Sequence, residues 1–100
     1  MVATTEFRVY EIKHGKLDAW VRLFLNEVKP LREREGFHID AAFAIPERDE
    51  FVWIVTYEGD ADAMRRADAA YYELPEHAPL HQEALLYLEG GSQAITMKVV

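Results

Sequence analysis

The run Phe-Val-Trp-Ile-Val-Thr-Tyr at residues 51–57 is apolar at almost every position. Its β-branched and aromatic residues predict a strand, and successive side chains of a strand point to opposite faces of its sheet. A strand with this sequence has no polar face to turn towards water. The sheet that contains it must therefore be covered on both sides.

The length of the chain allows one core. One hundred residues, 50% of them hydrophobic, predict a single domain over residues 1–100. The absence of cysteine removes disulfides and thiolate chemistry, and favours a reducing, cytoplasmic location. The first six residues lack the features of a secretory signal, and no apolar run approaches the roughly 20 residues that span a bilayer, so we expect a soluble protein.

The charge of the chain limits its partners. A net charge of −7 repels polyphosphate and anionic lipid, so neither nucleic acid nor a membrane is expected as a partner. The sequence also has no Gly-rich phosphate loop and no serine in a nucleophile elbow. Nucleotide hydrolysis and acyl transfer by their usual routes are therefore not expected.

The remaining periodic segments predict three further strands and a long first helix. An apolar stripe with spacings of three and four, from Leu17 to Leu31, predicts a helix that kinks at Pro30 and ends at Gly36. Alternating strand-like patterns occupy residues 5–12, 38–45 and 94–100.

Two more helices are expected in the second half of the chain. Asp60 is a typical N-cap for an alanine-rich helix over residues 61–72. A short helix that begins at Pro79 is expected over residues 80–88. The order is then strand, helix, strand, strand, helix, strand, which predicts an α+β, ferredoxin-like βαββαβ fold whose four-stranded antiparallel sheet carries helices on one face.

Strand alternation divides the sheet residues into two sets, and helices can cover only one of them. We expect the aliphatic set to face the helices: Phe7, Val9, Ile39, Ala41, Phe43, Val52, Ile54, Ile95, Met97 and Val99. The opposite set is mixed and aromatic: Arg8, Tyr10, Ile12, His38, Asp40, Ala42, Phe51, Trp53, Val55, Tyr57 and Thr96. One β-bulge would exchange some of these assignments.

The uncovered set predicts a homodimer. An exposed patch with these aromatic residues would exceed the few hundred Å² that monomers usually tolerate. A second copy packed sheet against sheet is the simplest cover, and it would bury on the order of 1,200 to 2,000 Å². On this model Trp53→Glu disrupts the dimer, because it places a charge between the sheets.

Residues 7–20, FRVYEIKHGKLDAW, resemble the opening of NIPSNAP-type domains, in which an Arg-x-Tyr strand leads through a glycine turn into an amphipathic helix. The resemblance covers nearly the whole chain, although His14 stands where the family typically has proline. Its other short matches are Pro30-Leu31, Gly36-Phe37, the strand end at Tyr57, and Tyr71-Tyr72 before Pro75-Glu76.

The resemblance implies a dimeric α+β barrel. That superfamily includes haem-degrading and cofactor-free monooxygenases, isomerases and stress-response proteins, whereas NIPSNAP-type proteins mostly lack an assigned activity. Fold analogy of this kind does not by itself assign a function.

Several side chains are candidates for a site. Arg8 and Tyr10 share a face and could hold an anionic or enolic oxygen, although an arginine paired with an acid is the commoner role. His38 and Asp40 also share a face and could form a general base with its carboxylate, but residues two apart rarely orient one another.

An aromatic pocket and a metal site are two further hypotheses, and for each of them a structural role is the commoner alternative. Trp53 and Tyr57 could line an aromatic pocket, although such residues on a central strand more often belong to a core or an interface. His77 and His81 have the spacing of two metal ligands on a helix, but Pro79 between them predicts that no helix runs through. No metal and no cofactor are therefore expected; if haem did bind, only His81 would be placed to hold it.

These observations predict a NIPSNAP-like dimer that binds a small, partly apolar molecule through Arg8, Tyr10, His38, Trp53 and Tyr57. One alternative is a cofactor-free monooxygenase or isomerase for an aromatic or polyketide-like substrate, with His38 moving a proton. The other is a structural dimerisation module. A pocket where Arg8, Tyr10 and His38 converge would favour the enzyme, and one filled by Trp53 and Phe51 would favour the module.

Overall fold

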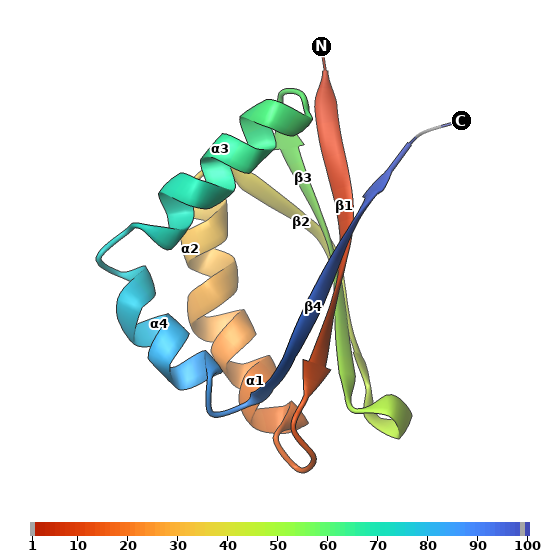
Figure 1. Cartoon of the computed structure of the whole chain (residues 1–100), viewed down its shortest axis with the longest axis vertical. Coiled ribbons are helices and arrows are strands. Elements are labelled where there is room, and N and C mark those ends of the chain that lie inside the picture. Colours follow the sequence, from red (N-terminus) through yellow and green to blue (C-terminus); the bar gives the residue numbers. More distant parts are fainter. Residues whose placement is uncertain (1, 99) are drawn as a thin grey trace.

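The computed structural model, which describes residues 2–98 and Val100, places three helices on one side of a twisted sheet (Figure 1). The elements are β1 (Ala3–Ile12), α1 (Leu17–Leu23), a π-helical segment (Phe24–Val28), α2 (Lys29–Arg34), β2 (Phe37–Ile45), a 3₁₀ turn (Pro46–Arg48), β3 (Glu50–Glu58), α3 (Ala61–Tyr72), α4 (His77–Ala84) and β4 (Leu88–Met97). α1, the π-helical segment and α2 follow one another without a break and form one long helix. Among the described residues, no helix has both the length and the apolarity needed to cross a bilayer.

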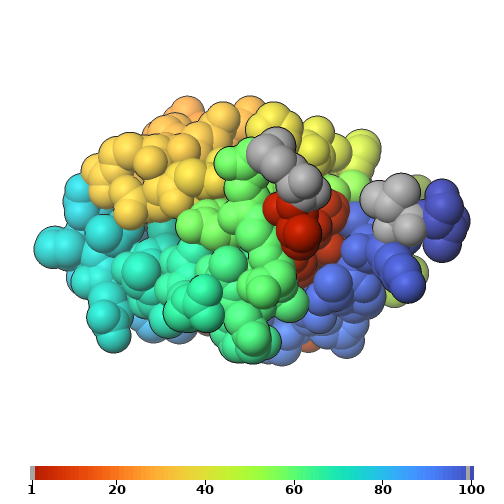
Figure 2. Space-filling model, turned by 90° about the horizontal axis from the view of Figure 1, so that it is seen from above, coloured from red at the N-terminus to blue at the C-terminus, as the bar shows by residue number. Residues whose placement is uncertain are grey.

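All strand pairs are antiparallel, and the strand order is β2-β3-β1-β4. This is the order of the ferredoxin-like fold, so the predicted fold class is confirmed. β4 lies at one margin of the molecule beside β1, and the helical layer lies on the other side (Figure 2). The assignment of Val99 to a face lies outside the described residues.

The first long helix is irregular near Pro30, as expected, but the irregularity is a π-helical segment before the proline. Lys29 N–H donates to the carbonyl of Phe24, five residues earlier. Proline has no N–H and its ring clashes with the carbonyl four residues before it, which here belongs to Asn26. A wider turn at this point accommodates Pro30, so the helix continues to Arg34 before Gly36, at φ +95°, ends it.

The expectation that no helix runs through Pro79 is wrong. α4 begins at His77, so Pro79 is its third residue. The N–H groups of the first helical turn have no acceptor within the helix, and a proline there sacrifices no hydrogen bond. His77 and His81 therefore lie one turn apart, with their ring centroids separated by 5.8 Å.

β4 is longer than expected, because it begins at Leu88 and not at residue 94. Gly90 and Gly91 lie inside the strand at positive φ, where the register to β1 shifts beside Glu11. Glycine tolerates this conformation without strain. The Gly90-Gly91 pair, which is typical of a turn, therefore forms a bulge within β4.

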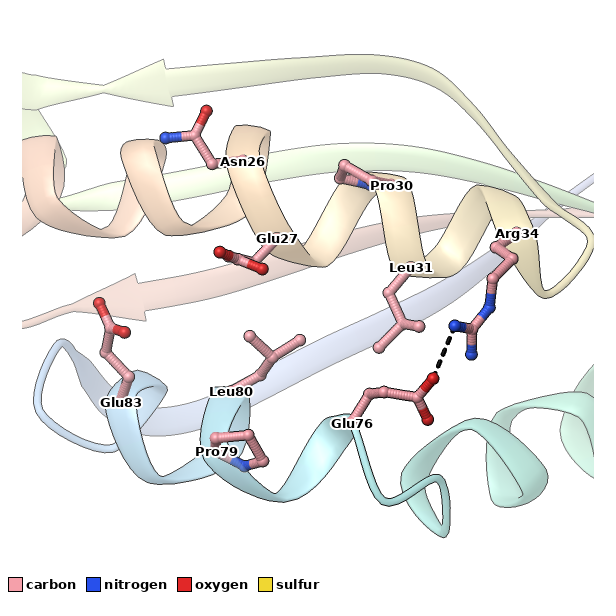
Figure 3. Close-up of a pocket in the computed structure, with 9 residues that line it drawn as sticks. All are labelled: Asn26, Glu27, Pro30, Leu31, Arg34, Glu76, Pro79, Leu80 and Glu83. Atoms are coloured by element: carbon pink, nitrogen blue, oxygen red, sulfur yellow. Dashed lines mark hydrogen bonds and ion pairs between the residues drawn. The ribbon is translucent and has the colours of Figure 1, made fainter.

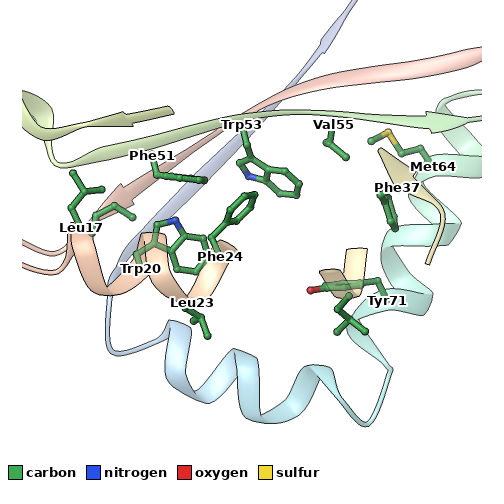
Figure 4. Close-up of a cluster of buried hydrophobic side chains, with 12 residues drawn as sticks. Leu17, Trp20, Leu23, Phe24, Phe37, Phe51, Trp53, Val55, Met64 and Tyr71 are labelled. Carbon is green, nitrogen blue, oxygen red and sulfur yellow. The ribbon is translucent and has the colours of Figure 1, made fainter. Parts of the chain in front are cut away.

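The side of the sheet that packs against the helices is not the one predicted from the sequence. Trp53 and Val55 are fully buried beneath the helices, together with Phe51 (Figure 4). Registers place the following residues on this helix side: Arg8, Tyr10, Ala42, Phe51, Trp53, Val55, Tyr57 and Thr96. The aliphatic set lies on the open side: Phe7, Val9, Ala41, Phe43, Val52, Ile54, Ile95 and Met97.

Three residues of β2 keep the faces predicted for them, although the rest of the sheet has the opposite arrangement. A β-bulge in β2 explains this difference. Ile39 pairs with Val55 and Ala41 pairs with Ile54, so Asp40 is an extra residue without a partner position. His38 and Asp40 therefore lie on the open side, and Ile39 lies on the helix side.

Aromatic volume accounts for the orientation of the sheet. The ring centroids of Phe24 lie 4.7 Å from Phe51 and 5.4 Å from Trp53, and Trp20 lies 5.8 Å from Phe51 (Figure 4). The large rings of the long first helix need large rings opposite them to fill the space between helix and sheet. The smaller aliphatic residues of the sheet remain for the open side.

Candidate functional site

A cavity of about 250 Å³ lies between the sheet and the helices. Every helix and both strands β1 and β4 contribute to its wall. It is lined by Tyr10, Trp20, Val28, Arg32, Tyr71, Tyr72, His77, Leu80, His81, Ala84, Leu88 and Ser92. An adjoining polar hollow of about 200 Å³ shares Tyr10, Tyr72 and Ser92 with it and reaches Arg8 and Asp68.

A larger hollow lies on the outside, between α2 and α4 (Figure 3). Its volume is about 580 Å³, and its floor is formed by Leu31 and Leu80. The ion pair at one end, Arg34 to Glu76 at 2.6 Å, is exposed and complete. Because this groove is lined by no buried polar group in need of a partner, we place the candidate site in the inner cavity.

Asp68 on α3 anchors the polar side of the inner site. Its Oδ2 accepts from Arg8 Nη2 at 2.7 Å and its Oδ1 accepts from Arg32 Nη1 at 2.6 Å. Arg8 also donates from Nε to Glu6 at 2.9 Å. Burial alone would lower the pKa of Arg8, but Asp68 and Glu6 outweigh it and raise that pKa. Nε and Nη2 of Arg8 are therefore both engaged by carboxylates of the same chain.

Arg32 lies within an aromatic cage and is 2% exposed. Its Cζ is 3.8 Å from the ring centroid of Tyr71 and 4.6 Å from that of Phe37. Nη2 donates to the Tyr72 hydroxyl at 3.2 Å. The cage fixes the plane of the guanidinium by cation–π contact, so its Nε–H also has a fixed direction.

Buried donors without acceptors accompany this site. Among the described residues they are Arg32 Nε, Trp20 Nε1 and Trp53 Nε1. Trp20 and Arg32 line the cavity, whereas Trp53 lies behind Tyr10 in the core. Buried polar groups in folded proteins are nearly always hydrogen-bonded, so each of these donors requires an explanation.

Tyr10 and His77 are neutral at neutral pH. Burial raises the pKa of Tyr10 to about 12, with a contribution from Tyr72. Burial, followed by the charges of His81 and Arg32, lowers the pKa of His77. Tyr10 is therefore a hydrogen-bonding phenol and not a proton acceptor, and His77 presents a neutral imidazole.

The structure brings together only part of the predicted site. Arg8 and Tyr10 lie side by side near the cavity, as expected. Trp53 is core and Tyr57 packs on Phe37, at a centroid distance of 5.1 Å. His38 lies on the other side of the sheet, 3.4 Å from Asp40, and its side chain is 72% exposed. The three candidates for catalysis do not converge in this chain.

Arg32 and Asp68 were not identified from the sequence, and His77 was considered only as a metal ligand. A signal was present for the first two, because each charged residue falls within the apolar stripe of its helix. Arg32 follows Leu31 and lies four residues after Val28, and Asp68 lies four residues after Met64. A charge in such a stripe indicates a buried ion pair. His77 was set aside because of Pro79.

No family model matches the sequence, and no curated protein matches it. Solved structures match closely in fold. An uncharacterized NIPSNAP domain protein from Burkholderia xenovorans has a TM-score of 0.84 at 14% identity, over 97% of this chain and 94% of that chain. A NIPSNAP family protein from Agrobacterium tumefaciens has a TM-score of 0.87 at 14% identity, over 99% and 94%.

A putative antibiotic biosynthesis monooxygenase from Bacteroides thetaiotaomicron is similar at a lower level. Its TM-score is 0.73 at 14% identity, over 98% of this chain and 90% of that chain. The chain therefore has the fold that the sequence resemblance implied, that of NIPSNAP-type proteins, and identities this low establish the fold alone.

Removal of the Asp68 carboxylate should destabilise the protein strongly. Asp68→Ala leaves two buried guanidinium groups facing each other, and breaking a buried pair in this way costs about 3 kcal/mol. The matched control is Asp62→Ala on the same helix, whose exposed pair with Arg65 contributes about 0–1 kcal/mol. Urea denaturation of both variants gives the comparison, and equal losses would contradict the anchoring role of Asp68.

His77 should make the stability of the protein depend on pH. An unfolded histidine takes up a proton near pH 6.5, at a higher pH than folded His77 does. The free energy of unfolding therefore falls as the pH drops through that value, and this part of the fall ends below the folded pKa. Between pH 7.5 and pH 5.5, the urea concentration at the midpoint of unfolding should therefore decrease less for His77→Gln than for the wild type.

The control for this measurement is His38→Gln, because His38 is an exposed histidine on the other side of the sheet. It should lose as much midpoint as the wild type over the same interval. If His77→Gln also behaves as the wild type does, burial of His77 has no effect on proton uptake.

Proposed function

We propose that this chain is a NIPSNAP-like protein that binds a small, partly apolar molecule in the cavity between the sheet and the helices. The observation that supports this is the mixed lining of the cavity. Aromatic and aliphatic walls from Trp20, Leu80 and Leu88 meet a few fixed polar groups from Tyr10 and Arg32. Ligand sites are typically hollows of this composition. The cavity alone, at about 250 Å³, is slightly below their usual range of roughly 300–1,000 Å³, and together with the adjoining hollow of about 200 Å³ it falls within that range.

The geometry gives no support to an enzyme built on Arg8, Tyr10 and His38. Arg8 is engaged by two carboxylates, Tyr10 keeps its proton, and His38 faces away. The activity in the name of one structural neighbour is therefore not part of this proposal. A purely structural role remains the competing hypothesis, since Trp53 and Phe51 fill the core beside the cavity. The cytoplasmic location stays a prediction from composition.

We also propose that the protein is a homodimer, joined through the open side of the sheet. The registers place apolar residues in rows across this side, and on its outer strands Phe43 is 55% exposed and Ile95 is 52% exposed. The chain exposes 6456 Å², whereas a compact monomer of 11.6 kDa exposes roughly 5,800 Å². The bare apolar side and the excess surface both favour a second copy as its cover.

The binding proposal is tested by native mass spectrometry of protein purified from its own host. We expect a small molecule to be retained by the wild type. Ala84→Phe fills the cavity from α4 and should abolish its retention, because Ala84 is part of the lining. Ala78→Phe, at an exposed position on the same helix, should retain it. Loss in both variants, or no bound mass in the wild type, would count against the cavity.

The dimer is tested by sedimentation velocity at micromolar concentration. Phe43→Glu and Ile95→Glu add charge to the open side, where the single chain tolerates it because both residues are half exposed. We expect both variants to sediment as monomers. Leu86→Glu, at a position outside the strands that is 61% exposed, should remain dimeric. The expectation attached earlier to Trp53→Glu does not apply, because Trp53 is in the core.

A further inference from the structure

We infer that the cavity selects an organic oxyanion, a carboxylate or enolate carried on an apolar ring. This inference rests on the binding proposed above and adds the chemical class of the ligand. It comes from the charges and the unpaired groups around the cavity.

The lining of the cavity has a charge composition unlike that of the chain. The sequence contains 18 acidic residues and has a net charge of −7. None of the acidic residues lines this cavity, whereas Arg32, His77 and His81 do. The nearest carboxylates, Glu6 and Asp68, line the adjoining hollow and are bonded to arginines. Within the cavity itself a cationic ligand would meet no carboxylate, and an anionic ligand would meet a guanidinium and two imidazoles.

The unpaired groups of the lining are donors. Trp20 and Arg32 are each 2% exposed, and neither Trp20 Nε1 nor Arg32 Nε has an acceptor. An indole N–H and a guanidinium N–H can donate but cannot accept. The ligand that satisfies them must present oxygen or another acceptor, and a ligand whose polar groups are only donors would leave them unpaired.

The state of Arg32 favours a charged acceptor over a neutral one. Nη1 donates to Asp68 and Nη2 donates to the Tyr72 hydroxyl, whereas Nε–H is buried and has no acceptor. Hydrogen bonds between ionised partners are roughly twice as strong as neutral ones. The hydrophobic wall formed by Val28, Leu80 and Leu88 then receives the apolar ring.

The test uses three probes that share one ring: naphthalene-2-carboxylate, 2-naphthamide and (2-naphthyl)methylammonium. The chain has two tryptophans, so its ¹⁵N–¹H spectrum contains two indole signals, and only Trp20 lines the cavity. At pH 7.5 we expect the carboxylate to move the Trp20 signal downfield and to leave the Trp53 signal nearly unchanged. Its affinity should be at least about tenfold higher than that of the amide.

Two variants serve as a matched pair. Trp20→Phe keeps an aromatic ring and removes the N–H donor, and it should weaken binding of the carboxylate about tenfold. Trp53→Phe removes the indole that does not line the cavity and keeps an aromatic ring beside Arg32, so it should weaken binding much less than Trp20→Phe does. The shift of the Trp20 signal in the wild type tests the contact even if a variant fails to fold.

The outcomes separate the inference from the proposal on which it rests. If the amide binds as tightly as the carboxylate, or if the ammonium compound binds more tightly, the oxyanion inference is wrong and binding by the cavity stands. If no probe moves either indole signal at millimolar concentration, the cavity does not bind such molecules and both statements are contradicted.

Discussion

The carboxylate of Asp68 lies between two guanidinium groups, one on β1 and one on α2, and so joins the sheet to both helical segments. An arginine cannot be left buried without a partner, so Arg8 must face the helix that carries Asp68. Strand alternation then puts Tyr10 on the same side, and the register puts Trp53 and Phe51 there as well. The buried ion cluster and the packing of the aromatic rings thus favour the same side of the sheet as core.

The cavity depends on the same cluster. Asp68 and Glu6 engage Nε and Nη2 of Arg8. Asp68 occupies only part of Arg32, and the rings of Tyr71 and Phe37 hold the rest of that guanidinium in place. Buried ion clusters of this kind add little net stability but penalise alternative arrangements. Here the arrangement leaves one oriented donor beside an apolar wall.

Much of the fold was predictable from local patterns, because strand order, helix 61–72 and the hairpin depend on periodicity and turns. Which side of the sheet faces the helices was not predictable. Both alternating sets of residues are largely apolar, and the partner of Arg8 lies 60 residues away in the sequence. The bulge at Asp40 has no sequence signal and moved His38 to the other side. For the site, Arg8 and Tyr10 indicated the right region. The role of Arg32 could not be predicted without knowing which helix packs against which strand.

The two sides of the sheet can serve different purposes because β1 and β3 alternate between them. Arg8 and Trp53 belong to the helix side, and their neighbours Phe7, Val52 and Ile54 belong to the open side. The cavity lies on the helix side, with its lining from the helices, β1 and β4 of one chain, so a second copy on the open side would be separated from it by the sheet. The proposed ligand binding and the proposed assembly should therefore respond to different substitutions. A substitution on the open side that prevents the proposed dimer would leave the groups around Arg32 in place.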